Sequence, residues 1–227
     1  MLTIWKVECE SNPALADAFT RLRYNYSRVK NLCALYKSTL AKKQGRVLVH
    51  QADILRSAVV FMHAMLEDCL RTIAAHYLPL AGEDFLNKIP LQGLNSSGKP
   101  EKFHLGELHK LKGMTVDQLI AGSVSSYLDR TTFNNVSDIV SLLKFMNKDA
   151  SQFSEFFPSL EKMINRRHEI VHRGDRTERP GKGKQYANSI RLSDVEKWAA
   201  QSNLFLERVF VSLADEGTVM KVRFVDL

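Results

Sequence analysis

The sequence is poor in the residues that build disulfide-stapled, cysteine-zinc or membrane-spanning proteins. It has three cysteines in 227 residues, Cys9, Cys33 and Cys69, and no Cys-x-x-Cys pair. This odd, widely spaced set excludes a disulfide framework and a cysteine zinc site, and it fits a reducing cytosol. No apolar run approaches the roughly 20 residues that cross a bilayer, and the first residues lack the pattern of a signal peptide. We therefore expect a cytoplasmic protein without membrane association.

The net charge of +7 is unevenly distributed along the chain. Residues 21–46 carry eight Lys/Arg and no Asp/Glu, and residues 161–191 carry nine Lys/Arg and four Asp/Glu. Two basic segments on a mildly acidic body indicate a polyanionic partner, most simply nucleic acid. Solvated helix surfaces and a charged loop would give the same counts, so both interpretations stay open at this point.

Apolar residues recur at helical spacing along most of the chain, which predicts an all-α helical bundle. Between Pro13 and Gly45 the spacing alternates between four and three, and residues 50–77 carry a broader apolar face. The short connection between these two long helices favours an antiparallel pair. We expect a single domain over residues 1–227, with its core between about 13 and 215.

Shorter helices and two terminal strands complete the predicted fold. The pattern Thr-x-x-Gln at residues 115–118 and the pattern Ser-x-x-Glu at residues 193–196 are typical of capping boxes that open helices. Shorter helices are expected over residues 115–128, 136–146, 158–173 and 193–213. Residues 219–225 alternate weakly, which predicts one minor strand that could pair with residues near Ile4.

The chemically distinctive segment is residues 166–172, Arg-Arg-His-Glu-Ile-Val-His. RNA is cleaved without a metal when a base removes the 2′-OH proton, that oxygen attacks phosphorus and an acid protonates the leaving 5′-oxygen. A histidine such as His172 can transfer protons, and the planar guanidinium of Arg167 matches phosphate oxygens. On a straight helix these side chains lie roughly 140° apart. Both reach one phosphate only if the helix unwinds near Gly174 or if two copies meet at a two-fold axis.

Two other interpretations of this segment are open. The residues from His168 to His172 match the pattern His-Glu-x-x-His, in which two histidines bind zinc and Glu169 is the base of a metallohydrolase. A third ligand is needed, the chain lacks the Gly and His that continue the pattern in metzincins, and the neighbouring arginines would repel a dication. The segment could also be a solvated helix end whose cations interact favourably with the helix dipole.

The same segment and its surroundings resemble the HEPN superfamily of helical ribonuclease domains. The signature of these domains is an arginine, four to six residues, and a histidine near the end of a late helix, which Arg167 and His172 match. The ending Ile-Val-His is typical of the branch that resembles RiboL-PSP-associated HEPN proteins. Two further segments are similar to the early and middle helices of that branch, at residues 56–71 and 131–143. The resemblance covers about residues 20–212.

This resemblance implies a metal-independent and cofactor-free endoribonuclease, commonly a toxin of a toxin–antitoxin system or an anti-phage defence protein. It implies a homodimer with the two motifs facing each other, RNA as the substrate and a cognate antitoxin as a protein partner. Carried over to this chain, Arg167 would contact the scissile phosphate, His172 would transfer protons and His168 would support or orient them. Arg166 and Arg173 would bind substrate, although Arg166 also stands at an allowed spacing of six before His172 and could be the motif arginine. Some members of the superfamily only bind RNA or protein, which leaves a non-catalytic module as the alternative.

Other polar and aromatic residues have simpler interpretations. His63 and Glu67 are four residues apart on a predicted helix and are expected to form a surface pair, or else a polar pair that reaches the cleft. Tyr24, Tyr26 and Tyr36 lie among the basic residues of the first helix and could stack on bases. Tyr26 and Tyr36 fit the apolar stripe, so we expect these two in the core.

Overall fold

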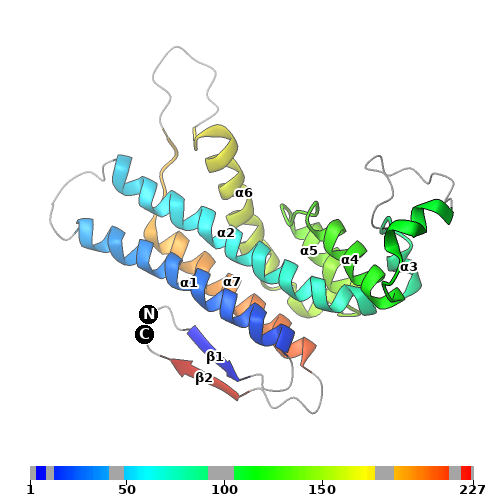
Figure 1. Cartoon of the computed structure of the whole chain (residues 1–227). Helices are drawn as coiled ribbons and strands as arrows, with labels where there is room; N and C mark the ends of the chain where they lie inside the picture. Colours follow the sequence, from blue (N-terminus) through cyan, green and yellow to red (C-terminus); the bar gives the residue numbers. More distant parts are fainter. Residues whose placement is uncertain are drawn as a thin grey trace.

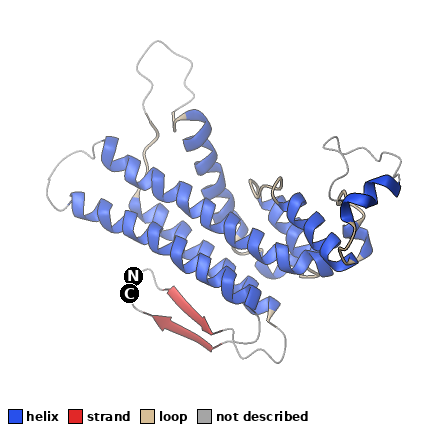
Figure 2. Cartoon of the chain, in the orientation of Figure 1, coloured by secondary structure: helices blue, strands red, loops and turns tan. Residues whose placement is uncertain are grey.

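The computed structural model describes residues 4–8, 13–40, 49–91, 105–176, 187–214 and 221–225. This part of the chain is mostly helical (Figure 2), which confirms the all-α prediction. Its α-helices are α1 (Pro13–Leu40), α2 (Val49–Tyr77), α3 (Glu83–Leu86), α4 (Val116–Leu128), α5 (Val136–Phe145), α6 (Phe157–Arg173) and α7 (Leu192–Leu213). Short 3-10 helices cover Leu78–Leu80, Leu105–Leu111 and Ala150–Phe153. The predicted end of the first helix near Gly45 lies outside the described residues.

Helices α1 and α2 form the antiparallel pair that the sequence predicts, and α7 packs against both of them (Figure 1). The apolar stripe of α1 faces this interface, and Tyr26 and Tyr36 are buried within it, as expected. Cys33 and Cys69 are also buried, whereas Cys9 lies outside the described residues. Burying each large apolar side chain stabilises the fold by about 1.5–3 kcal/mol, so the α1–α2 interface is the main support of the bundle.

Helix α2 is the central element, because it contacts α1, α4, α6 and α7. The side chains of Val59, Met62, Leu66 and Leu70 have no exposed surface. Helices α3, α4 and α5 gather at the far end of α2, and α6 then returns along it (Figure 1). One cluster of buried residues runs from Leu15 to Leu213. No helix in the described ranges is both long enough and apolar enough to span a membrane.

The two ends of the described chain pair as a small sheet. Strand β1 (Ile4–Glu8) is antiparallel to strand β2 (Lys221–Val225), with Ile4 opposite Val225 and Glu8 opposite Lys221. Figure 2 shows this sheet beside α1. The predicted pairing of the terminal segments is therefore confirmed.

One of the two predicted capping boxes is present. The hydroxyl of Thr115 accepts from the backbone N–H of Gln118 at 3.2 Å, and the Gln118 side chain accepts from the N–H of Thr115 at 2.9 Å. The capping box expected at Ser193 is wrong, because α7 begins before Ser193 and its N-cap residue makes no side-chain hydrogen bond. Glu196 pairs instead with Lys37 of α1 at 2.8 Å. The Glu196 carboxylate, which the local pattern predicted to cap the start of α7, therefore forms an ion pair with a lysine of a distant helix.

Candidate active site

Helix α6 is continuous through the whole Arg–His segment. Pro158 stands in its first turn, where a proline loses no helical hydrogen bond. The helix ends at Arg173, and Gly174 adopts the left-handed conformation with a φ of 59°, which favours glycine. Arg167 and His172 therefore both lie on regular helix, and unwinding before Gly174 is not observed. Their directions differ by roughly 140° at the regular helical pitch.

Arg167 points toward α2 and the turn before α5. Its Nη1 lies 3.4 Å from Oδ1 of Asn134, and its positive charge acts on His63 of α2. Burial lowers the pKa of His63, and the charge of Arg167 lowers it further. Arg167 is partly exposed, so it is not enclosed by the protein.

Polar side chains of α2 hold the turn that carries Asn134. His63 contacts the carbonyl oxygen of Phe133 through Nε2 at 3.2 Å. Glu67 accepts from the N–H of Phe133 at 3.4 Å, and Arg71 donates to the carbonyl of Thr131 at 2.8 Å. The expected pair of His63 and Glu67 is present, with Nδ1 of His63 3.8 Å from Oε2 of Glu67, but His63 is 1% exposed, so the expected location of the pair at the surface is wrong. The turn covers this side of α2. Its backbone N–H and carbonyl groups form the hydrogen bonds to the polar side chains of α2 that water was expected to form.

His168 and His172 project together from another side of α6. Their ring centroids are 4.6 Å apart with an interplanar angle of 43°, as expected for residues one helical turn apart. Both side chains are exposed. The structure thus brings the two histidines together, and it places Arg167 apart from them, against the Asn134 turn.

Arg166 belongs to a buried charge cluster. Asp175, with no exposed surface, accepts at Oδ2 from Nη2 of Arg166 at 2.9 Å and from Nε of Arg56 at 2.6 Å. Arg166 also donates to the carbonyl oxygen of Ser189 at 3.0 Å, and Arg56 to that of Asn188 at 2.7 Å. The cluster ties the end of α6 to α2 and to the segment that leads into α7. Substrate binding by Arg166 stays a prediction. A bound substrate would have to replace some of the hydrogen bonds that Arg166 makes to Asp175 and Ser189.

Arg173 is the last residue of α6, and its side chain is exposed. It lies next to His172 in the sequence and carries a positive charge at the end of the helix where the dipole favours cations. Its predicted role in substrate binding is not tested by this placement.

The zinc interpretation requires a third ligand near the two histidines. No group of three or more His, Cys, Asp or Glu side chains with metal-binding geometry occurs in the described parts of the chain. Glu196 is bound to Lys37, and Glu169 lies 3.6 Å from Arg166. The residues that the structure describes therefore do not fit a three-ligand zinc site.

The sequence interpretation missed Asn134 and the role of His63. A signal was present, because polar residues recur at positions 63, 67 and 71 of an otherwise apolar helix, which indicates that a polar segment packs on this side. Asn134 gave no such signal, since it reaches Arg167 across 33 residues of sequence.

Comparison with known proteins gives one match. The RiboL-PSP-HEPN family model matches residues 24–214, which span α6 with its Arg–His segment and most of the bundle. Searches of curated proteins and of solved structures found no match. Since the family model covers most of the chain, and the helices and the Arg–His segment stand in the order that the resemblance implied, this protein belongs to the RiboL-PSP-HEPN family, whose membership indicates an RNA-related function.

Proposed function

We propose that the protein is a metal-independent endoribonuclease that acts as a homodimer, in the role of a toxin or an anti-phage defence effector. The proposal combines the family membership with the chemistry of Arg167 and His172. The partner in such a system would be a cognate antitoxin protein.

In the proposed reaction, a general base takes the proton of an RNA 2′-hydroxyl, and the resulting oxygen attacks the adjacent phosphorus. The bond from phosphorus to the 5′-oxygen breaks, and an acid protonates that oxygen. His172 carries one of these proton transfers. The guanidinium of Arg167 stabilises the negative charge that gathers on the phosphate oxygens. His168, whose ring lies 4.6 Å from that of His172, orients it.

The observation that carries the proposal is the placement of Arg167 and His172 on different sides of an uninterrupted helix. Arg167 lies against Asn134, whereas His172 lies against His168. A single copy therefore presents these groups in diverging directions. A two-fold axis beside α6 would bring the arginine of one copy toward the histidine of the other, which makes a composite site.

The direct test is cleavage of a labelled single-stranded RNA in the presence of EDTA. His172→Ala should lower the rate by about 10²–10⁴-fold, the usual cost of losing a general acid or base. Arg167→Ala should be similarly severe, and Arg167→Lys should recover little, since lysine lacks the planar fork. His76→Ala is the matched control, because His76 is exposed near the other end of α2. Cleavage by His172→Ala at the parent rate would reject the site.

A further variant separates this mechanism from zinc hydrolysis. Glu169→Gln should leave RNA cleavage nearly unchanged, because Glu169 has no role in the proposed reaction. The same change would abolish a metallohydrolase in which this residue is the base. RNA binding without any cleavage would instead support a non-catalytic binding module.

The assembly is tested separately. Light scattering at micromolar concentration should give twice the chain mass of 25.8 kDa. Mixing Arg167→Ala with His172→Ala should restore part of the activity, since a mixed dimer retains one intact pair of groups. A strict monomer at high concentration would contradict the composite site.

A further inference from the structure

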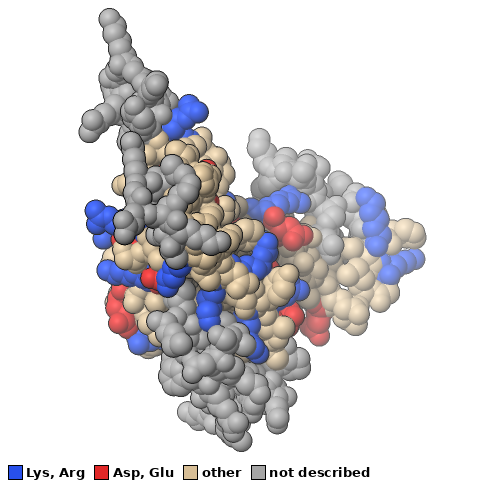
Figure 3. All heavy atoms as spheres, turned by 90° about the vertical axis from the view of Figure 1, so that its left-hand side faces the viewer, with Lys and Arg blue, Asp and Glu red and all other residues tan. Residues whose placement is uncertain are grey.

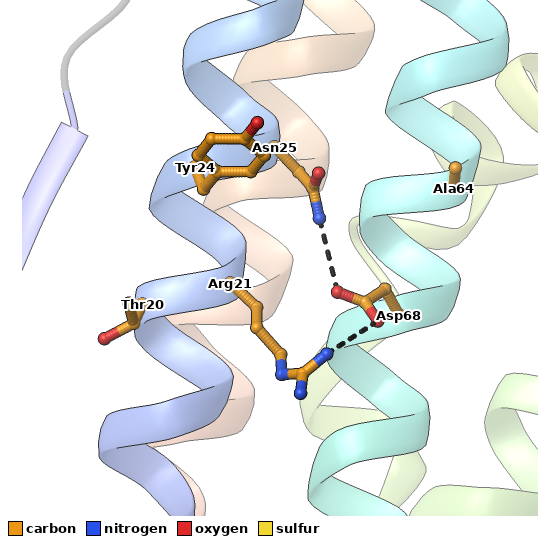
Figure 4. A pocket seen from close by; sticks show the side chains of 6 residues that line it. All are labelled: Thr20, Arg21, Tyr24, Asn25, Ala64 and Asp68. Carbon is orange, nitrogen blue, oxygen red and sulfur yellow. Dashed lines mark hydrogen bonds and ion pairs between the residues drawn. The ribbon is translucent and has the colours of Figure 1, made fainter.

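A pocket of about 580 Å³ lies between α1 and α2, and no residue of the Arg–His segment lines it. Figure 4 shows Arg21, Tyr24 and Asn25 on α1, with Asp68 and Ala64 facing them from α2. Its volume falls within the range of small-ligand sites, about 300–1,000 Å³. The pocket therefore has the size to receive one planar group.

An exposed aromatic ring forms one wall of this pocket. Tyr24 is 69% exposed, although Tyr26 and Tyr36 of the same helix are buried. The guanidinium of Arg28 lies 4.0 Å from the ring centroid of Phe61 and 6.0 Å from that of Tyr24. Aromatic rings and guanidinium planes are the surfaces on which unpaired RNA bases stack.

A positioned carboxylate forms the opposite wall. Asp68 accepts from Nδ2 of Asn25 at 3.2 Å, and its other oxygen lies 3.6 Å from Nη1 of Arg21 (Figure 4). These contacts hold the carboxylate in one orientation and leave further lone pairs available, since two carboxylate oxygens offer about four acceptor sites. Such a group can accept from the N–H donors on the edge of a base.

The residues of α1 from Arg21 onward carry mostly positive charges. Residues 21–40 contain Arg21, Arg23, Arg28, Lys30 and Lys37 and no Asp or Glu. Arg21 pairs with Asp17 and Lys37 with Glu196. Among the described residues Arg28 makes no ion pair, so its charge is available to a phosphate.

Figure 3 shows Lys and Arg interspersed with Asp and Glu on the end of the molecule where α1 ends and α2 begins, so the basic side chains there form no single patch. Recognition at the groove therefore depends on its own residues.

The groove also lies close to the Arg–His segment. Ala64 lines the pocket, and the preceding residue of α2, His63, senses the charge of Arg167. Successive residues of a helix differ by about 100° in direction, so the pocket and Arg167 lie on adjoining sides of the same turn of α2.

We propose that the groove between α1 and α2 is a base-binding subsite for single-stranded RNA, in which one unpaired base stacks on Tyr24 and Asp68 accepts from its N–H donors. This inference rests on the proposed function for the identity of the substrate. Duplex RNA does not fit this subsite, because its bases are stacked and paired.

The test measures RNA affinity by fluorescence anisotropy, using the full chain with His172→Ala so that the RNA stays intact. Tyr24→Ala should weaken binding of a labelled single-stranded 12-nucleotide RNA by about 5- to 150-fold, the range for losing one stacked base. Tyr24→Phe should retain binding, because the ring remains. Both variants should bind a labelled duplex RNA within about two-fold of the parent. Leu80→Ala removes another exposed apolar side chain, 78% exposed on a 3-10 helix beyond α2, and is the matched control.

The outcomes separate this inference from the proposed function. Single-strand affinity that is unchanged in Tyr24→Ala, or an equal loss on duplex RNA, would overturn the subsite while leaving the nuclease proposal intact. If Tyr24→Ala loses single-strand binding, and the chain with an intact His172 binds RNA without cutting it, the subsite is supported and the nuclease is rejected. Asp68→Asn should change the order of affinities among otherwise identical RNAs that differ in one base, since one acceptor oxygen becomes a donor. An unchanged order would remove Asp68 from the recognition.

Discussion

The buried carboxylate of Asp175 should be the most sensitive single position for the stability of the α6 end. Its Oδ2 accepts from two guanidinium groups, at 2.6 Å from Arg56 and 2.9 Å from Arg166. These arginine side chains are only 10% and 16% exposed. Removing the charge of Asp175 leaves both cations close together in a site that water scarcely reaches.

Breaking a buried ion pair from one side costs about 3–5 kcal/mol. We expect the lower end, about 3 kcal/mol for Asp175→Asn, because carbonyl oxygens of Asn188 and Ser189 still accept from the arginines. Asparagine is the cleaner change, since Asp175 has a φ of 57° and asparagine tolerates this left-handed conformation. The amide group of the asparagine would gain few hydrogen bonds, because the second carboxylate oxygen of Asp175 is buried without a partner in the described part of the chain.

The assay is thermal unfolding followed by circular dichroism. At about 2–4 °C per kcal/mol for a chain of this size, Asp175→Asn should melt about 6–12 °C below the parent protein. Asp53→Asn is the matched control, because Asp53 pairs with the same Arg56 but its side chain is 59% exposed. That surface pair should contribute no more than about 1 kcal/mol. Equal melting temperatures for Asp175→Asn and the parent would refute the role of the cluster.

Three further predictions concern the site and its surroundings. Asn134→Ala should lower the RNA cleavage rate about 2- to 10-fold at an unchanged melting temperature, since it removes a long contact to Arg167; a parent-like initial rate would exclude a positioning role. Unfolding by urea should show stability rising with pH up to about 6.5, because the lowered pKa of His63 means that the unfolded chain binds its proton more readily. Arg167 and Glu67 are the charges that face this ring. His63→Gln should therefore reduce the change of unfolding free energy with pH; the same pH dependence in that variant would show that another group causes it. The logarithm of the RNA affinity should fall linearly with the logarithm of the salt concentration, and an anisotropy titration that shows no salt effect would reject phosphate contacts.

The long helices could be predicted from the sequence because their stabilisation follows a local pattern. The apolar stripe of α1 repeats at the spacing of one helix face, so Leu22, Tyr26 and Val29 are buried where the period places them. The capping box at Thr115 is local in the same sense, since both of its hydrogen bonds join residues three apart. Features whose partners lie within one helical turn are therefore accessible to sequence reasoning.

The environment of the site could not be predicted, because its partners are distant in sequence. Arg56 and Asp175 are separated by 119 residues, and no period links them. His63 was expected at the surface, since the turn that covers it enters the chain 70 residues later. Arg166 and Arg167 are adjacent and chemically alike, yet one is held by a buried carboxylate and the other faces an open turn. Only the folded structure distinguishes them.

The antiparallel pairing of β1 with β2 determines how the chain would respond to a pulling force. Ile4 lies opposite Val225, at the outer end of both strands. Tension applied through the two ends would load the ladder one residue pair at a time, from Ile4 toward Glu8, in the manner of a zipper. In this geometry the strands separate at low force, before the load reaches α1 and α7. Under such tension the terminal sheet would therefore separate first, while the helical bundle stays folded.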